Sequence, residues 1–167
     1  FIPYRRAFAA GAPLAMTAHI LYKRIDPLWP ATVSPTILKG ILRRILGFQG
    51  LVVSDDLEMK GVSSILGPAE AAVAGLRAGI NLLLFCGPLH HLIAAQRGVM
   101  ERLSRDQALI AGVIESLAAV ARLKKRWRLH RYRGSSRALQ ALLKDGAKQR
   151  LEKELSLAAT SLFPAGA

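Results

Sequence analysis

Cysteine is almost absent from the 167 residues, and acidic side chains are scarce. Cys86 is the only cysteine, so the chain cannot form an internal disulfide, and nothing in it indicates an oxidising compartment. Eleven Asp and Glu stand against 24 Lys and Arg, which gives a net charge of +13. Hydrophobic residues make up 51% of the chain, a share typical of a globular protein and not of a disordered one.

Long hydrophobic runs and nucleotide-binding motifs are also missing. Residues 7–22 and 78–96 carry no charge, but Gly, Pro and His interrupt them, whereas a membrane span needs about 20 mostly apolar residues. The chain has no Gly-x-Gly-x-x-Gly fingerprint and no phosphate-binding P-loop, which argues against the usual nucleotide-binding folds. No His, Cys or Asp spacing is typical of a metal site, so we expect neither a metal nor another cofactor.

The most informative stretch is residues 47–59, which read GFQGLVVSDDLEM. The apolar run 51–53 is rich in β-branched residues and is typical of a strand buried on both faces. Ser54, Asp55 and Asp56 follow directly, and an apolar-periodic segment opens after them. Two adjacent carboxylates therefore lie where a strand ends and a helix begins, which is where parallel α/β folds bind ligands.

The same residues also have a purely structural interpretation. Ser and Asp are preferred N-cap residues, because their oxygens accept hydrogen bonds from the free N–H groups of the first helical turn. Capping needs only one of the two acids, however, and like charges so close together resist joint ionisation. At the level of the residues alone, both interpretations stay open.

Three candidate strands, at residues 13–19, 50–54 and 80–86, alternate with predicted helices. This alternation predicts a parallel sheet, either doubly wound or part of a (β/α)8 barrel. A complete barrel needs about 250 residues, so this chain would hold only part of one. The predicted helices include a short one ending at Gly11 and others at about 35–46, 57–65, 69–78, 89–103 and 107–128.

Three strings of residues carry a family resemblance: MTAHILYKRIDPLWPATVSP, LRRILGFQGLVVSDDLEMKGV and AGINLLLFC. They resemble the barrel of glycoside hydrolase family 3, and within it the bacterial β-N-acetylhexosaminidases. The resemblance covers about residues 1–128. It implies the C-terminal portion of a (β/α)8 TIM-type barrel, about three βα units, with a basic helical extension at 129–167.

The resemblance also implies an activity, namely retaining hydrolysis of terminal β-linked N-acetylglucosamine. It places that activity in the cytoplasm, in peptidoglycan recycling, and the single cysteine fits this location. A β-glucosidase-type substrate is the alternative within the family.

The resemblance assigns roles to four residues. Asp55 is expected to be the nucleophile that attacks the anomeric carbon and forms a covalent glycosyl-enzyme. Asp56 is expected to support the geometry of the site, and with it His19 and Met59 would form the substrate-binding surroundings. On its own, a histidine such as His19 is more often a hydrogen-bonded structural residue.

The chain departs from the family pattern at several positions. Asn81 stands where the third strand usually has an acid, and Ile45 stands where we expect an acidic residue on a helix surface. The family's acid/base group, a His with an Asp partner near a KHFPGHG motif, has no match in the chain. His90, His91 and His130 lack that context, so we assign them no catalytic role.

These departures lead us to expect a fragment of the enzyme. The chain begins with Phe1 and not Met, and the family's acid/base motif lies upstream of the matched region. The expected partners are the glycan and a missing N-terminal barrel half. Alone, the chain is expected to be inactive and to aggregate through its exposed strand edge.

Residues 122–133, RLKKRWRLHRYR, hold seven Lys and Arg with Trp127 and Tyr132 between them. Such a run suits a non-catalytic module that binds nucleic acid or another polyanion. It equally suits the solvated end of a helix, where cations complement the helix dipole. We favour the second interpretation and expect no nucleic-acid partner. One more amphipathic helix is predicted at 137–156.

Overall fold

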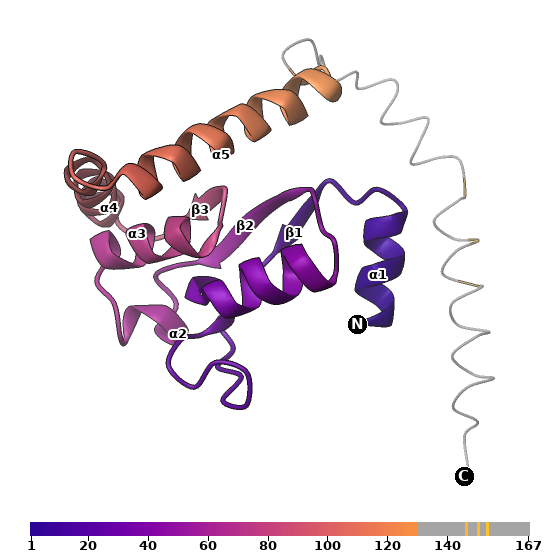
Figure 1. Cartoon of the computed structure of the whole chain (residues 1–167), viewed down its shortest axis with the longest axis horizontal. Coiled ribbons are helices and arrows are strands. Elements are labelled where there is room, and N and C mark those ends of the chain that lie inside the picture. Colours follow the sequence, from indigo (N-terminus) through magenta and orange to yellow (C-terminus); the bar gives the residue numbers. More distant parts are fainter. Residues whose placement is uncertain (130–145, 147–149, 151–152, 154–167) are drawn as a thin grey trace. The chain divides into compact units, whose positions relative to one another are not determined.

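The structure, a computed structural model, describes residues 1–129, 146, 150 and 153. Phe1–Trp127 form one compact unit and Arg128–Ala167 form another. The elements labelled in Figure 1 all belong to the first unit. His130 and most of the helix predicted at 137–156 lie outside the described residues, and the predicted domain boundary at 128/129 stays a prediction.

Three parallel strands form the centre of the first unit (Figure 1). They lie side by side in the order in which they occur along the chain, so β2 is the central strand. Leu14 pairs with Leu51, and Val53 pairs with Leu82. The predicted α/β fold with a parallel sheet is therefore confirmed. The strands are β1 (Leu14–Met16), β2 (Leu51–Asp56) and β3 (Leu82–Leu84).

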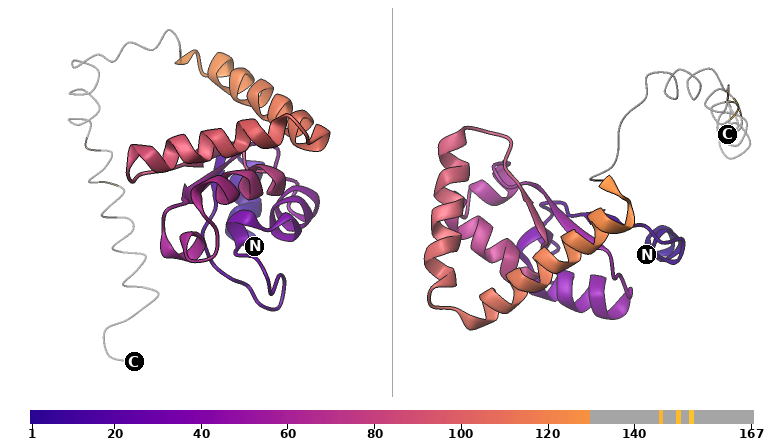
Figure 2. Two further views of the ribbon diagram at one scale, coloured as in Figure 1. Left: turned by 90° about the vertical axis from the view of Figure 1, so that its left-hand side faces the viewer. Right: turned by 90° about the horizontal axis from the view of Figure 1, so that it is seen from above.

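Helices connect the strands and continue after the last one (Figures 1 and 2). Glycines in the left-handed region end two of them, Gly47 after η2 and Gly79 after α3, because a residue without a Cβ adopts that conformation without strain. The helices are α1 (Ile2–Ala9), η1 (Ala31–Val33), η2 (Thr36–Ile45), α2 (Lys60–Ser63), α3 (Pro68–Ala78), α4 (Leu89–Leu103) and α5 (Gln107–Arg126).

The core lies on one side of the sheet. There, Val52 of β2 packs with Phe48, with Leu38 of η2 and with Ala78 of α3. Alternation along the strands directs Met16, Val53 and Asp55 to the opposite side. Met16 is 62% exposed, so η2 and α3 cover only the first side, and Asp55 lies on the other.

Two of the predicted strands are shorter than expected, for identifiable reasons. The strand predicted at 13–19 ends at Met16, because the next N–H of β2 on this side, that of Asp55, donates to the Thr17 hydroxyl (3.4 Å) and not to a backbone carbonyl. The strand predicted at 80–86 covers Leu82–Leu84. Its Leu84 N–H donates to Ser54 Oγ (2.9 Å), which replaces a regular backbone bond of the ladder.

No helix among the described residues combines the length and hydrophobicity that a membrane crossing requires.

Candidate active site

The two adjacent carboxylates are the last residues of β2. The helix that follows, α2, begins at Lys60, and its N-cap residue is Met59, with no side-chain cap. Neither Asp55 nor Asp56 caps a helix, so the capping interpretation is wrong. The helix predicted at 57–65 is reduced to Lys60–Ser63 because residues 57–59 form a turn that the carboxylate of Asp56 organises.

Asp56 holds two loops together at the end of the sheet. Its Oδ1 accepts hydrogen bonds from Glu58 N (3.1 Å) and from Cys86 N (3.2 Å). The first bond closes the turn after β2, and the second ties that turn to the segment after β3. This arrangement supports a positioning role for Asp56.

Asp55 is partly exposed and fixed from two sides. Its Oδ1 accepts a hydrogen bond from the backbone N–H of Asp56 (2.8 Å), which orients the carboxylate. Its own N–H donates to Thr17 Oγ1 (3.4 Å), just beyond the end of β1. The carboxylate therefore lies at the C-terminal end of the central strand, on the sheet face that η2 and α3 leave uncovered.

His19 joins this site through a chain of hydrogen bonds. Its Nε2 lies 2.7 Å from the carbonyl oxygen of Asp56, and because a carbonyl can only accept, Nε2 carries the hydrogen. In the neutral ring, Nδ1 then accepts from the Thr32 hydroxyl (2.7 Å). Thr32 Oγ1 in turn accepts from Thr17 Oγ1 (2.9 Å). This chain of hydrogen bonds therefore runs from the N–H of Asp55 to the carbonyl of Asp56. Within it, His19 has the contacts of a structural histidine.

A close approach keeps His19 in place. A Cβ added to Gly61, in α2, would lie 2.6 Å from the Cβ of His19 and 3.0 Å from its carbonyl oxygen. Real Cβ atoms do not come so close, so the ring depends on glycine at this position.

Met59 adjoins the site through its backbone. Its N–H donates to the carbonyl of Asp56 (3.0 Å), and its side chain is 50% exposed. The structure therefore places the predicted residues Asp55, Asp56, His19 and Met59 around one turn.

Sequence reasoning missed Thr17 and Thr32, and it also missed a pair formed by Glu58 and His91. Glu58 Oε1 lies 2.5 Å from His91 Nδ1, and the second carboxylate oxygen accepts from the N–H of Gly87. His91 was set aside because it lacks the family's histidine motif. A signal was present, since the residues after neighbouring parallel strands meet at one edge of a sheet.

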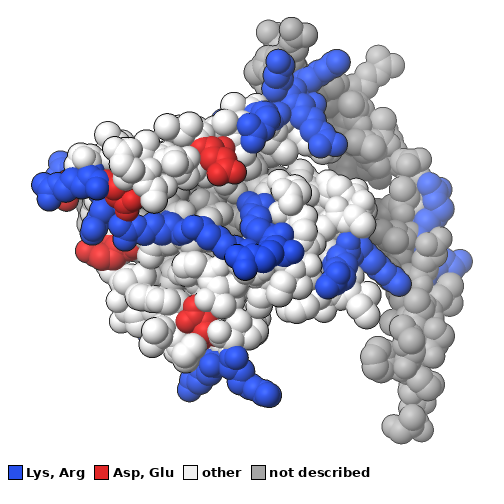
Figure 3. Space-filling model, viewed as in Figure 1, with Lys and Arg blue, Asp and Glu red and all other residues white. Residues whose placement is uncertain are grey.

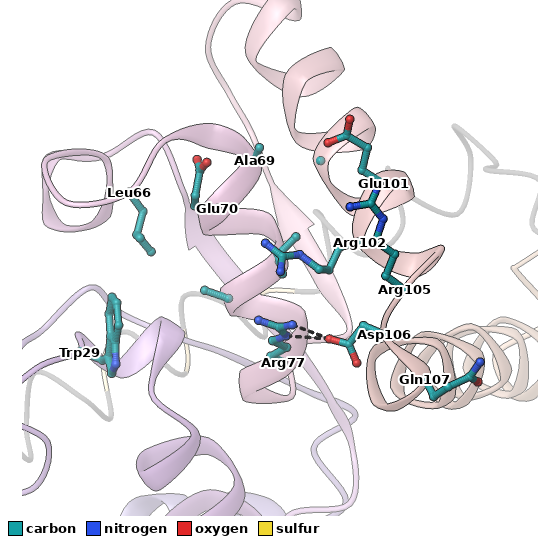
Figure 4. A pocket seen from close by; sticks show the side chains of 13 residues that line it. Trp29, Leu66, Ala69, Glu70, Arg77, Glu101, Arg102, Arg105, Asp106 and Gln107 are labelled. Carbon is teal, nitrogen blue, oxygen red and sulfur yellow. Dashed lines mark hydrogen bonds and ion pairs between the residues drawn. The ribbon is translucent and has the colours of Figure 1, made fainter.

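A cavity of about 920 Å³ lies elsewhere, bordered by α3, α4 and Trp29 (Figure 4). Arg77 and Asp106 on its wall form an ion pair (2.5 Å), which lowers the pKa of Asp106. None of the four predicted site residues lines this cavity. Among the described residues, no cluster of three or more His, Cys, Asp or Glu side chains is placed to bind a metal ion.

Comparison with known proteins identifies the class. Residues 1–122 match the model of the glycosyl hydrolase family 3 N terminal domain. This match covers most of the chain, which therefore belongs to glycosyl hydrolase family 3.

Similar proteins within the family include named hexosaminidases. The β-hexosaminidase of Nitrosospira multiformis is 41% identical over 85 residues, covering 51% of this chain and 24% of the relative. The β-hexosaminidase A of Pseudoalteromonas piscicida is 29% identical over 95% of this chain and 29% of its own length. The chain thus spans about a quarter to a third of the curated relatives it matches.

Solved structures agree with this placement. A family 3 β-N-acetylglucosaminidase from a Paenibacillus species (strain FPU-7) superposes with a TM-score of 0.71 at 32% identity, covering 80% of this chain and 26% of that one. The β-N-acetylglucosaminidase of Thermotoga maritima gives a TM-score of 0.67 at 32% identity, over 72% of this chain and 27% of that one. The sequence-based resemblance to the family's β-N-acetylhexosaminidases is confirmed.

Proposed function

We propose that Asp55 is the nucleophile of a retaining β-N-acetylhexosaminidase that removes terminal β-linked N-acetylglucosamine. The observation that carries this proposal is the place of Asp55, partly exposed at the C-terminal end of the central strand. In barrels of this kind, catalytic groups lie at the C-terminal ends of strands. The names of the similar relatives support the choice of sugar.

The proposed chemistry has two displacement steps. A carboxylate oxygen of Asp55 attacks the anomeric carbon, the bond from that carbon to the leaving oxygen breaks, and a general acid protonates the leaving oxygen. Water then attacks the anomeric carbon, gives up a proton to the same group acting as base, and releases Asp55. Asp56 and His19 position the turn that carries the nucleophile, and Met59 borders the space for the sugar.

The general acid is proposed to come from barrel units other than these three. The family resemblance places that group in an upstream segment, and the uncovered sheet face around Met16 and Val53 is the surface such units would cover. We therefore propose that residues 1–167 alone are inactive. Peptidoglycan recycling in the cytoplasm is the setting that the resemblance favours.

A chimera tests the assignment. Residues 1–122 would replace the matching segment of the Pseudoalteromonas piscicida relative, which aligns with 95% of this chain. Release of nitrophenol from p-nitrophenyl β-N-acetylglucosaminide would then be measured. We expect activity that falls by at least about a thousandfold on Asp55→Asn, because the covalent step loses its nucleophile. A 5-fluoro-N-acetylglucosaminyl fluoride should add one sugar mass to the peptide containing Asp55.

The matched control is Asp56→Asn, which keeps the nucleophile and should retain more activity than Asp55→Asn. Labelling of any other residue would refute the nucleophile assignment. Hydrolysis by residues 1–167 alone, lost on Asp55→Asn, would refute the need for further units.

One similar structure is a β-glucoside phosphorylase, at 26% identity and a TM-score of 0.60. A preference of the chimera for β-glucosides, or a requirement for phosphate, would therefore replace the proposed reaction.

A further inference from the structure

The long helix α5 is fixed to the rest of the first unit by its inner side. Asp106 accepts from Leu109 N (2.9 Å) at the start of the helix, and its other oxygen pairs with Arg77 of α3. In the middle of the helix, Asn81 Nδ2 donates to Ser116 Oγ (2.9 Å). Leu109 is buried on the same side. These contacts fix which side of α5 faces outward.

The outward side of α5 carries an apolar stripe. Ile110, Ile114, Leu117 and Ala121 are spaced by four, three and four residues, which places them on one side of a helix. Ile114 is 61% exposed and Leu117 is 65% exposed. In the right-hand view of Figure 2, no other ribbon passes in front of α5, which is drawn in orange. Large aliphatic side chains therefore face solvent in the middle of the helix.

Two cations flank the end of the stripe. Lys124 and Lys125 follow it in the last turn of α5, both are exposed, and helical spacing places one on each edge of the stripe. Arg122 and Arg126 are also exposed, but they lie on another side of the helix, beside Gly50 and Leu51. Glu115 is the only acidic residue of the helix. Figure 3 shows Lys and Arg gathered where α5 ends. We call the apolar stripe together with Lys124 and Lys125 the α5 surface.

Two occupants fit the α5 surface poorly. A nucleic acid would use the cations but would leave Ile114 and Leu117 without a partner. A second copy of the chain would bring cations together in either orientation. In a parallel helix pair the two basic ends meet, and in an antiparallel pair each basic end meets a helix N-terminus, itself a positive pole, with Arg105 beside it.

We infer that the α5 surface binds the surface of an anionic lipid bilayer, with the helix lying in the plane of the headgroups. Aliphatic side chains enter the boundary between headgroups and acyl chains, while neighbouring Lys and Arg pair with lipid phosphates. The helix would lie on the membrane and not cross it. This inference does not depend on the glycosidase activity.

Vesicle binding by the 167-residue chain tests the inference. The probes are vesicles of phosphatidylcholine alone and of phosphatidylcholine with phosphatidylglycerol at about three to one. We expect cosedimentation with the anionic vesicles and at least about tenfold weaker partition to the neutral ones. Binding to the anionic vesicles should weaken by about tenfold or more in each of two double variants, Ile114→Gln with Leu117→Gln and Lys124→Glu with Lys125→Glu. Salt at 0.5 M should also weaken binding, because it screens the attraction between the lysines and the lipid phosphates.

Matched controls lie on other elements. Ile45→Gln with Ile65→Gln removes two exposed aliphatic side chains outside α5, and Lys23→Glu with Lys60→Glu reverses two exposed charges. Both control pairs should bind as the parent chain does, and circular dichroism checks that every variant is folded. Equal losses in control and test pairs would overturn the inference, because binding would then not depend on the position of these side chains on α5.

A second readout follows the stripe itself. In a chain with Trp29→Phe and Trp127→Phe, Leu117→Trp gives a single indole in the middle of the stripe. Its emission should shift to shorter wavelength with anionic vesicles and be quenched by brominated acyl chains. Binding to single-stranded RNA without vesicle binding, or a dimer that Ile114→Gln with Leu117→Gln dissociates, would overturn the inference in favour of the other occupant.

Discussion

Uncharged residues near Asp55, the proposed nucleophile, fix the backbone around it. Thr32 is completely buried, and its hydroxyl links Thr17 to the ring of His19. The SDD motif identifies Asp55 from the sequence. The contact between the two threonines could not be predicted from the sequence, because they lie 15 residues apart and meet only where the loop after β1 returns to the sheet.

The contact between Gly61 and His19 gives a prediction at this scale. Gly61→Ala would force a methyl group against the Cβ and carbonyl of His19, so we expect a loss of about 1–3 kcal/mol of unfolding free energy. Urea denaturation measures it. Gly112→Ala is the control, because no atom outside its own helix lies within 4 Å of the added Cβ. There the change should stabilise the chain by up to about 1 kcal/mol, and an equal loss at both positions would refute the role of the contact.

Asp26 gives a second residue-level prediction, on pH. A hydrogen bond from the Ser34 hydroxyl (2.6 Å) and two backbone N–H donors, at Leu28 and Trp29, lower the pKa of Asp26, while burial acts in the opposite direction. A lowered pKa in the folded state means that the ionised form stabilises the fold. That contribution is complete above the ordinary Asp pKa of about 4 and is lost as the pH falls through the lower folded value.

Ser34→Ala removes the largest cause of this shift. We therefore expect the pKa of Asp26, followed by NMR of its carboxyl carbon, to rise toward its ordinary value. The unfolding free energy should then depend less on pH below about 4. Thr36→Val, at an exposed neighbouring position, should leave the pKa of Asp26 unchanged.

At the scale of elements, Arg43 ties η2 to the segments that lead into β2 and β3. Its guanidinium donates to the carbonyls of Phe48 (2.8 Å) and Gly50 (2.6 Å) and to Asn81 Oδ1 (3.2 Å). Burial lowers the pKa of Arg43, and Glu115 partly opposes that effect. Asn81, identified from the sequence as a departure from the family pattern, therefore faces a half-buried cation. Ile45, the other departure, is exposed as expected.

Replacing Asn81 by the acidic residue that the family pattern has at this position should strengthen its contact with Arg43. Asn81→Asp keeps acceptors for Arg43 and Val52 N, and it can accept from the Ser116 hydroxyl in place of the present donor. We expect a gain of about 1 kcal/mol in unfolding free energy at pH 7. The gain should disappear in acid, because a carboxylate stabilised by Arg43 has a lowered pKa and contributes only while ionised. Asn81→Leu should destabilise the chain, and a gain from that change would contradict the explanation.

At the scale of the whole molecule, the sequence predicted the alternation of strands and helices and the family. It could not predict where β1 and β3 end. Those limits depend on Thr17 and Ser54 side chains that replace backbone partners, and propensity carries no information about such exchanges.

The uncovered sheet face gives a prediction for the 167-residue chain in solution. Met16 and Leu14 are exposed on it, and such apolar faces promote association. Met16→Glu should therefore lower binding of the dye ANS and raise the concentration at which the chain stays monomeric, measured by light scattering. Met100→Glu is closely matched, because Met100 on α4 is also 62% exposed. If both changes act equally, added charge and not the sheet face explains the result.

The hydrogen bonds through Thr17, Thr32 and His19 begin and end on adjacent residues, so they close a ring around the end of β2. The two ends of this ring have a fixed direction, because the N–H of Asp55 can only donate and the carbonyl of Asp56 can only accept. The hydroxyls between them can both donate and accept. The backbone of the proposed nucleophile is therefore clasped at both ends, whichever way the hydrogens between the two threonines point.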